Sequence, residues 1–294
     1  MLLVELRNSK LDTQQNNFCK QSMLTLVPTP IGNLEDISSR ALDALKSAEL
    51  FFCEDTRVTK RLLNLLSSRY NLTFICDSFQ SLHHHNEQKV LKALDKNLLL
   101  DKNVVYVSDA GMPCVSDPGS TLVEYCIQNE IPYDVIPGAN AVLTAFAMSG
   151  FNTTEFSFFG FLPHKGKDRH EKLLKVLNSE FLTILYESPH RLLKLLEELA
   201  KIEPSRILFL AKELTKLHQK TFKKTALELY EEFKDLNIRG EWVVVLQNKP
   251  SAGSILELSD ISELDLPPKQ KAKLISKLTG RKTKEVYQEI LDKI

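Results

Sequence analysis

The chain has 294 residues, which is enough for two domains with substantial apolar cores. Its 38 basic and 38 acidic residues balance, so no overall charge indicates a nucleic-acid partner, and RNA or DNA would have to bind a local basic patch. The spacing of its five cysteines argues against a zinc knuckle and a disulfide framework, and without a membrane-length apolar run or a signal-peptide core we expect a cytoplasmic protein with no membrane partner.

Residues 1–22 are polar and weakly patterned, so we expect a flexible N-terminal extension, or an upstream start with Met23 as the true first residue. From Met23 onward apolar strands alternate with amphipathic helices, which predicts a mainly parallel sheet with helices on both faces. The expected strands are 24–27, 50–53, 72–76, 104–107 and 133–136. The expected helices include 59–66, 83–94 and 121–128, and apolar spacing predicts another over Ile37, Ala41, Leu45 and Ala48.

A second series of strands and helices follows a small-residue helix expected at 139–149. We place the boundary near Pro137 and Gly138, which gives an N-terminal α/β domain over 23–137 and a C-terminal α/β domain over 138–249. The expected strands of the second domain are 156–161, 182–186, 207–210 and 242–246, and its expected helices are 170–177, 191–201 and 226–234.

The composition changes near the end of the chain. Residues 250–268 contain four acidic residues and no basic residue, with Gly and Pro among them, so we expect a linker. Residues 269–294 contain eight basic residues and three acidic ones. Their apolar spacing predicts two short helices broken at Gly280, which together would form a basic helical tail.

The turn after the first strand, Pro28-Thr29-Pro30-Ile31-Gly32-Asn33, holds a single glycine. Across the whole chain no two glycines are separated by one residue, so neither G-x-G-x-x-G nor a Walker loop is present. This disfavours a Rossmann dehydrogenase, a P-loop NTPase and a glycine-rich Rossmann methyltransferase. The turn is stiffened by its prolines, and it is either one wall of a ligand site or a rigid connector from strand to helix.

Two later loops also follow expected strands. The stretch VYVSDAGMPCVSDPGS (105–120) contains Asp109-Ala110-Gly111 and Asp117-Pro118-Gly119, and VIPGANA (135–141) follows the next strand. Ligands of open α/β sheets bind beyond the carboxyl ends of strands, where small residues allow the backbone to approach closely. These loops therefore predict one shared crevice, with a pair of ordinary turns as the alternative.

Charged residues follow other strands. Glu54, Asp55 and Arg57 come directly after the strand at 50–53, where charges serve chemistry or cap the next helix. The segments YESPHRL (186–192) and KELTKLHQ (212–219) combine polar and basic residues, with a solvated loop as the alternative for each. In the run His83-His84-His85, consecutive helical side chains point about 100° apart and cannot converge on one ion, so we expect no metal site.

A family resemblance rests on nine segments in order: TPIGNLEDISSRAL, CEDTRVTKRLL, HHHNE, VSDAGMPCVSDPG, VIPGANA, GFLPHKGKDR, YESPHRL, KELTKLHQ and GEWVVV. Together they resemble the bacterial ribosomal RNA small-subunit methyltransferase I family of the tetrapyrrole methylase superfamily. The resemblance covers about residues 24–246, and the basic tail is similar to that family's small C-terminal helical region. Two residues depart from the family pattern: Met112 stands where Thr is frequent, and Asn140 where Ser is usual.

The resemblance implies two α/β domains of the tetrapyrrole methylase type, with S-adenosyl-L-methionine in the cleft between them, in a homodimer. It implies methylation of the ribose 2′-hydroxyl of a cytidine in the decoding region of 16S rRNA. Carried over onto this sequence, the residues expected at the cofactor are Pro30, Ile31, Gly32, Asp109, Ala110, Gly111, Ser116, Asp117, Pro137, Gly138, Ala139, Tyr186, Ser188, Leu214 and Gly240.

Methyl transfer from a sulfonium needs no metal, since alignment of donor and acceptor supplies much of the rate and a base that takes the hydroxyl proton adds to it. The candidate bases are Glu54, Asp55 and Glu213. The candidate contacts to RNA phosphate or ribose are Arg57, His85, Arg191, Lys212 and Lys216, and the basic tail would add salt-sensitive attraction.

Three alternatives remain open at this level: a methyltransferase of the same fold that acts on a tetrapyrrole, one that acts on a protein, and a non-catalytic 16S rRNA-binding assembly factor. The basic tail and the segments CEDTR, HNE and ESPHR favour RNA as the acceptor. An assembly factor would leave the strand-end loops unexplained.

Overall fold

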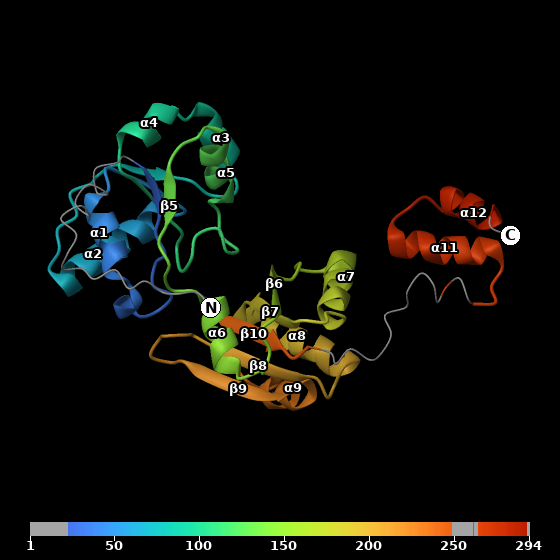
Figure 1. The fold of residues 1–294 in the computed structure, drawn as a ribbon. Helices are drawn as coiled ribbons and strands as arrows, with labels where there is room; N and C mark the ends of the chain where they lie inside the picture. The colour runs from blue at the N-terminus through green and yellow to red at the C-terminus, as the bar shows by residue number, and fades with distance from the viewer. Residues whose placement is uncertain (1–22, 249–260, 262–263, 293–294) are drawn as a thin grey trace. The chain divides into compact units, whose positions relative to one another are not determined.

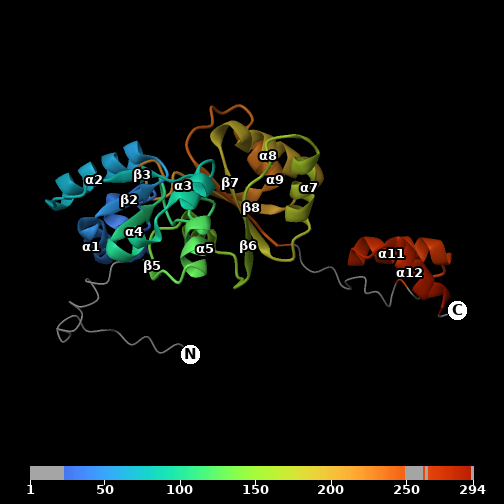
Figure 2. The same cartoon turned by 90° about the horizontal axis from the view of Figure 1, so that it is seen from above.

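A computed structural model describes residues 23–248, 261 and 264–292 (Figures 1 and 2). The expected N-terminal extension and most of the expected linker over 250–268 lie outside the described residues. The chain divides into two compact units between Gln247 and Asn248, and each unit is described by itself. None of the helices in the described ranges is long and apolar enough to cross a membrane.

The first sheet is entirely parallel, as expected, with the strand order β3-β2-β4-β1-β5. Its strands are β1 (Leu24–Leu26), β2 (Leu50–Cys53), β3 (Phe79–Ser81), β4 (Val104–Val107) and β5 (Tyr133–Val135). Its helices are η2 (Leu34–Asp36), α1 (Ser39–Ser47), α2 (Thr56–Tyr70), α3 (Glu87–Ala93), α4 (Lys96–Asp101) and α5 (Ser120–Gln128).

The central strand β4 shows why the strands of this sheet have uninterrupted apolar sequences. Val104 and Tyr106 pack in a core cluster with residues of α3, α4 and α5, whereas Val105 and Val107 pack in a second cluster with residues of α1 and α2. Successive side chains of a strand point to opposite faces, so a strand covered on both faces is apolar at every position. All four residues are buried.

The second sheet is mixed, with the order β6-β7-β10-β8-β9. Only β6 and β7 run parallel, and the other three pairs are antiparallel. Its strands are β6 (Phe156–Phe161), β7 (Leu182–Glu187), β8 (Ile207–Lys212), β9 (Lys220–Thr225) and β10 (Trp242–Leu246). One face packs against α7 (Gly166–Leu177), α8 (Pro189–Ile202) and α9 (Ala226–Phe233), and the other against α6 (Ala141–Ser149) (Figure 1).

Two sequence-based expectations about strands are wrong. The segment 72–76 is not a strand, and Ile75 within it is 82% exposed; β3 comes later instead, where Phe79 stacks on Phe51 with ring centroids 5.1 Å apart. Strand β9, the lysine-rich segment KTFKKT, was not among the expected strands. It is an edge strand paired with β8, and lysines on an edge discourage further pairing.

Polar residues fix where several helices begin. Ser38, Asp55 and Asn140 each accept a hydrogen bond from a backbone N–H in the first turn of α1, α2 and α6. Thr225 and Glu228 form a capping box at the start of α9. Two of these caps, Asp55 and Asn140, follow strand ends, so the same residues that start helices lie at the edge where a ligand would bind.

The second unit contains the two short helices expected in the tail, α11 (Pro268–Thr279) and α12 (Thr283–Leu291). Gly280 ends α11 in the left-handed conformation, with φ of 71°. The Ser276 hydroxyl donates to the carbonyl of Arg281, and the Thr283 hydroxyl donates to Ser276 at 2.9 Å. These bonds join the two helices across the turn.

Candidate active site

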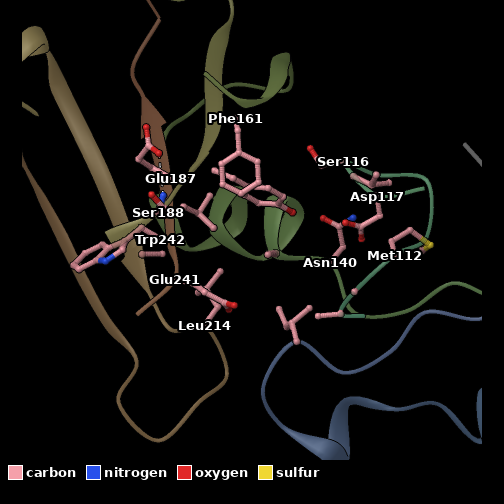
Figure 3. A pocket seen from close by; sticks show the side chains of 18 of the residues that line it. Met112, Ser116, Asp117, Asn140, Phe161, Glu187, Ser188, Leu214, Glu241 and Trp242 are labelled. Carbon is pink, nitrogen blue, oxygen red and sulfur yellow. Dashed lines mark hydrogen bonds between the residues drawn. The ribbon is translucent and has the colours of Figure 1, made fainter. Parts of the chain in front are cut away.

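A cavity of about 300 Å³ lies in the first unit, lined by residues from both sheets (Figure 3). Its volume is within the range of small-molecule sites. Met112, Ser116, Asp117 and Asn140 lie on one side of it and Glu187, Ser188 and Trp242 on the other, as Figure 3 shows. The full lining consists of Ile31, Ala110, Gly111, Met112, Val115, Ser116, Asp117, Asn140, Ala141, Phe161, Tyr186, Glu187, Ser188, Pro189, Ala211, Leu214, Glu241, Trp242 and Val243.

The three strand-end loops of the first sheet are in direct contact. The amide of Thr29 donates to the carbonyl of Gly111 at 2.9 Å, and the amide of Gly111 donates back to Thr29 at 3.0 Å. A Cβ atom on Gly138 would lie 2.4 Å from Cγ of Pro28. The loops therefore meet at one edge of the sheet, and this is the geometry that the shared-crevice interpretation predicted.

Gly32 joins this edge to the second sheet. A Cβ atom on Gly32 would lie 2.4 Å from Cγ of Lys216 and 2.8 Å from the carbonyl oxygen of Leu214. The amide of Asn33 donates to the Thr215 hydroxyl at 3.1 Å. The turn over 28–33 therefore closes against the loop that follows β8, and its single glycine stands where the two backbones approach most closely.

The chemistry of the lining is apolar and acidic. Tyr186 packs against Phe158 and Phe161, with ring centroids 5.0 and 5.5 Å apart, and Ile31 and Leu214 add aliphatic walls. No Lys, Arg or His is among the described residues that line the cavity, whereas three carboxylates are. A phosphate ligand would be disfavoured there, and a ligand with a positive charge and an apolar ring system suits the site.

Two arginines balance the charge of the Glu187 carboxylate. Its side chain is fully buried, and Oε1 lies 3.1 Å from Nε of Arg191. Arg169 lies 3.9 Å from the other oxygen and 2.7 Å from Glu198. Both arginines also donate to the carbonyl of Pro163. The Arg191 guanidinium is thus used within the protein, so its surroundings lend no support to the prediction that it contacts RNA.

The three candidate bases lie outside the lining. The Arg57 side chain lowers the pKa of Asp55 to about 2. Burial raises the pKa of Glu213, but the amide of Glu241 and the ammonium of Lys216, at 2.8 and 3.1 Å, outweigh it and leave the pKa below its ordinary value.

Glu54 differs from the other two candidates. Burial raises its pKa, although one carboxylate oxygen accepts a hydrogen bond from the amide of Asp109 at 3.3 Å. A carboxylate with a raised pKa takes a proton more readily at neutral pH, so the surroundings favour Glu54 over Asp55 and Glu213 as a base.

Of the fifteen residues expected at the cofactor, eight line the cavity: Ile31, Ala110, Gly111, Ser116, Asp117, Tyr186, Ser188 and Leu214. The other seven flank the lining in sequence or pack behind it: Pro30, Gly32, Asp109, Pro137, Gly138, Ala139 and Gly240. Gly240, for example, has φ of 85° and leaves room for the side chain of Glu213.

Sequence reasoning missed eleven of the nineteen described lining residues, among them Phe161, Glu187 and Trp242. All three lie at strand ends in the second sheet. Glu187 and Trp242 are paired in register between β7 and β10. The only signal was their place at the end of an apolar run, because the strand pairing that brings these ends together is not encoded locally.

The remaining candidates for RNA contact are not themselves lining residues, although Lys212 and Lys216 contact residues that line the cavity. Arg57 is 88% exposed and paired with Asp55 at 2.6 Å, and Nζ of Lys212 lies 5.8 Å from the centre of the Trp242 ring. Lys216 bridges Glu213 and Glu241. In the segment 83–85 the amide of His85 donates to Nδ1 of His83. Within the described ranges no group of three or more His, Cys, Asp or Glu is arranged to hold a metal ion.

Comparisons with known proteins agree with this architecture. The model of the tetrapyrrole (corrin/porphyrin) methylase family matches residues 23–230, and the chain belongs to that family. Among its similar relatives are two named ribosomal RNA small subunit methyltransferase I. The one from Campylobacter fetus is 48% identical over 92% of this chain and 100% of the relative, and the one from Helicobacter pylori strain 26695 is 45% identical over 92% and 99%.

Solved structures with the same fold are more distant in sequence. Uroporphyrin-III C-methyl transferase from Thermus thermophilus, complexed with S-adenyl homocysteine, superposes with a TM-score of 0.52 at 14% identity, covering 76% of this chain and 96% of that one. A cobalt precorrin-4 methyltransferase superposes with a TM-score of 0.54 at 15% identity, covering 76% and 94%. At this level of identity they show the fold alone.

Proposed function

We propose that the protein uses S-adenosyl-L-methionine to methylate the ribose 2′-hydroxyl of a cytidine in the decoding region of 16S rRNA, and that it acts in the cytoplasm. The observation that carries the proposal is the full-length match, at 45–48% identity, to relatives named as small-subunit rRNA methyltransferases. The tetrapyrrole methylases of the same fold are only 14–17% identical to this chain. They therefore support the fold but do not identify the molecule that accepts the methyl group.

The lining of the cavity fits this cofactor. When bound, the sulfonium compound supplies an already activated methyl group. Tyr186, Ile31 and Leu214 offer apolar surface to a ring system, and the acidic lining without basic residues among those described suits a cationic molecule. Gly111, with φ of 87°, and the small residues beside it bring backbone groups to the cavity wall.

Apart from the reacting ribose, the acceptor would bind outside the cavity. Arg57, His85, Lys212 and Lys216 remain the candidate contacts to phosphate and ribose, because they lie near strand ends around the site and bear donors suited to RNA. The basic helices α11 and α12 would add attraction for RNA that does not depend on sequence.

A second copy of this chain is the partner that the surface of α6 favours. The helix AVLTAFAMS is apolar on all sides, and one side packs on the second sheet through Val142 and Ala145. Leu143 and Met148, on its outer side, are 54% and 40% exposed. An all-apolar helix is normally buried all round, so a homodimer that covers this surface accounts for its composition.

The direct test is transfer of labelled methyl groups to three acceptors: small ribosomal subunits, naked 16S rRNA and a tetrapyrrole precursor. We expect label in 16S rRNA and none in the tetrapyrrole. Label in the tetrapyrrole alone, or no transfer to any RNA although the donor binds, would overturn the proposal.

A further inference from the structure

Three carboxylates line the cavity, and basic side chains neutralise two of them. Glu187 is paired with Arg191, and Oε2 of Glu241 lies 2.7 Å from Nζ of Lys216. Within the described part of the chain, Asp117 forms no ion pair. Asp117 is therefore the lining carboxylate whose charge no adjacent cation balances.

The groups around Asp117 place it between the cavity and the strand-end acids. Tyr186 lines the cavity from β7, and burial, followed by the charge of nearby Asp117, raises the pKa of its phenol to about 12. On the other side Asp117 faces the ends of β2 and β4. The titratable and polar groups that influence it are Glu54, Asp109, His84 and Ser108, and Asp117 in turn influences the buried phenol of Tyr106.

We propose that Asp117 is the proton acceptor of the methyl-transfer reaction, a role that rests on the proposed function. The hydroxyl oxygen of the acceptor forms a bond to the methyl carbon while the carbon–sulfur bond breaks and its electron pair stays on sulfur. The hydroxyl proton passes to a carboxylate oxygen of Asp117, so the charge of the sulfonium and that of the carboxylate are both lost. No metal or further reactant is needed.

The turn that carries Asp117 is held from behind. Glu87, at the start of α3, is buried, and its carboxylate accepts hydrogen bonds from the amide of Gly119 at 2.8 Å and from the Thr121 hydroxyl at 3.1 Å. A Cβ atom on Gly119 would lie 2.6 Å from the ring of Tyr106. The backbone next to Asp117 is thus packed and bonded, which holds in place the turn that carries its carboxylate.

The pKa values agree with this role. Burial, followed by repulsion from Glu54, raises the pKa of Asp117 to about 6, although the Ser108 hydroxyl lowers it. A base is most effective when its pKa lies near the operating pH. Asp55, with a pKa of about 2, holds a proton far less well.

The first test is Asp117→Asn, which keeps the shape of the side chain and removes its basicity. At saturating donor and RNA we expect kcat to fall by about 10²- to 10⁴-fold, while the affinity for S-adenosyl homocysteine, measured by calorimetry, changes less than threefold. Asp43→Asn on the exposed side of α1 is the charge-matched control and should keep full activity. A wild-type kcat in Asp117→Asn, or a loss of affinity without a loss of kcat, would overturn the assignment.

The second test uses Glu54→Gln and separates Asp117 from the other candidate. Removing the Glu54 charge lowers the pKa of Asp117, so the acid limb of the kcat–pH profile should move from near pH 6 to lower pH. A carbon-13 NMR titration of the Asp117 carboxyl in the unliganded protein should show the same shift. If Glu54→Gln abolishes transfer while Asp117→Asn retains it, Glu54 is the base.

The two proposals fail in different ways. If wild-type protein transfers no methyl group to RNA, the proposed function fails. If wild-type protein is active and Asp117→Asn is equally active, only the assignment of Asp117 fails.

Discussion

Gly32 explains how a turn with one glycine can serve a cofactor site. Its neighbours are side-chain and backbone atoms of Leu214, Thr215 and Lys216, so the glycine allows two loops to close on each other. A phosphate site would instead need a row of free amides, and the lining contains no basic residue among those described. A glycine-rich motif is therefore absent because the ligand is not a phosphate, as well as because the fold differs.

Gly32→Val should push the loop over 214–216 away from the turn over 28–33. We expect a loss of about 1–3 kcal/mol in the free energy of unfolding, together with at least a tenfold loss of affinity for S-adenosyl homocysteine. Calorimetry and denaturant titration measure the two effects. Gly166→Ala is the comparison, because a Cβ atom there meets nothing within 4 Å and the change tests backbone conformation alone. Unchanged affinity in Gly32→Val would show that the turn is only a connector.

Arg169→Met should be far more destabilising than a similar change at the surface. The side chain of Arg169 is 3% exposed and lies between Glu187 and Glu198. Its loss leaves Glu198 without this partner and the buried Glu187 with Arg191 alone. The expected cost is about 3–5 kcal/mol in the free energy of unfolding. Arg40→Met, which removes an exposed pair with Asp134, should cost about 0–1 kcal/mol. Equal costs in denaturant titrations would contradict this account of Arg169.

At the scale of elements, the sequence predicted most helices and strands but not the pairing in the second sheet. Strands such as β2 and β4 are apolar throughout and flanked by charged or small residues, so local pattern sufficed. The prediction missed strand β9 because this strand is stabilised by pairing with β8 and not by apolar residues of its own. In the cavity, the loops after the parallel strands of the first sheet were foreseen from their own sequence. Tyr186, Ser188 and Leu214 came only from the family resemblance, and Phe161, Glu187 and Trp242 were missed.

Helix α3 couples the histidine segment to the cavity wall through Glu87. Glu87→Ala leaves the buried amide of Gly119 without its acceptor, which should cost about 1–3 kcal/mol in the free energy of unfolding. It should also lower kcat by loosening the turn that carries Asp117.

Glu87→Gln is the matched variant for this change. Its amide oxygen can accept from Gly119 and its amino group can donate to the Thr121 hydroxyl, so most of the activity should return. If kcat and stability are unchanged in Glu87→Ala, the bonds from α3 do not position the turn.

At the scale of the whole molecule, the outer side of α6 predicts an oligomer. Leu143→Glu places a charge on that surface and should convert a dimer to a monomer in sedimentation at micromolar concentration, without unfolding it. Leu65→Glu on the exposed side of α2 is the matched control and should leave the oligomeric state unchanged. A wild-type protein that sediments as a monomer would refute the homodimer.

Deleting residues 269–294 separates attraction for RNA from binding of the cofactor. The helices of this tail belong to a different compact unit from the cavity, and most of their lysines are exposed. We expect RNA methylation to weaken and its salt dependence to become shallower, with nearly unchanged affinity for S-adenosyl homocysteine. An equal loss of both would show that the tail is needed for the fold of the first unit.

We expect this chain to methylate a ribose in 16S rRNA. The most direct measurement is mass spectrometry of nucleosides from 16S rRNA of small subunits incubated with the protein and deuterated methyl donor. We predict that the label appears in 2′-O-methylcytidine from the decoding region and that Asp117→Asn removes most of it. Label on a base carbon, or in no nucleoside of 16S rRNA, would contradict the claim.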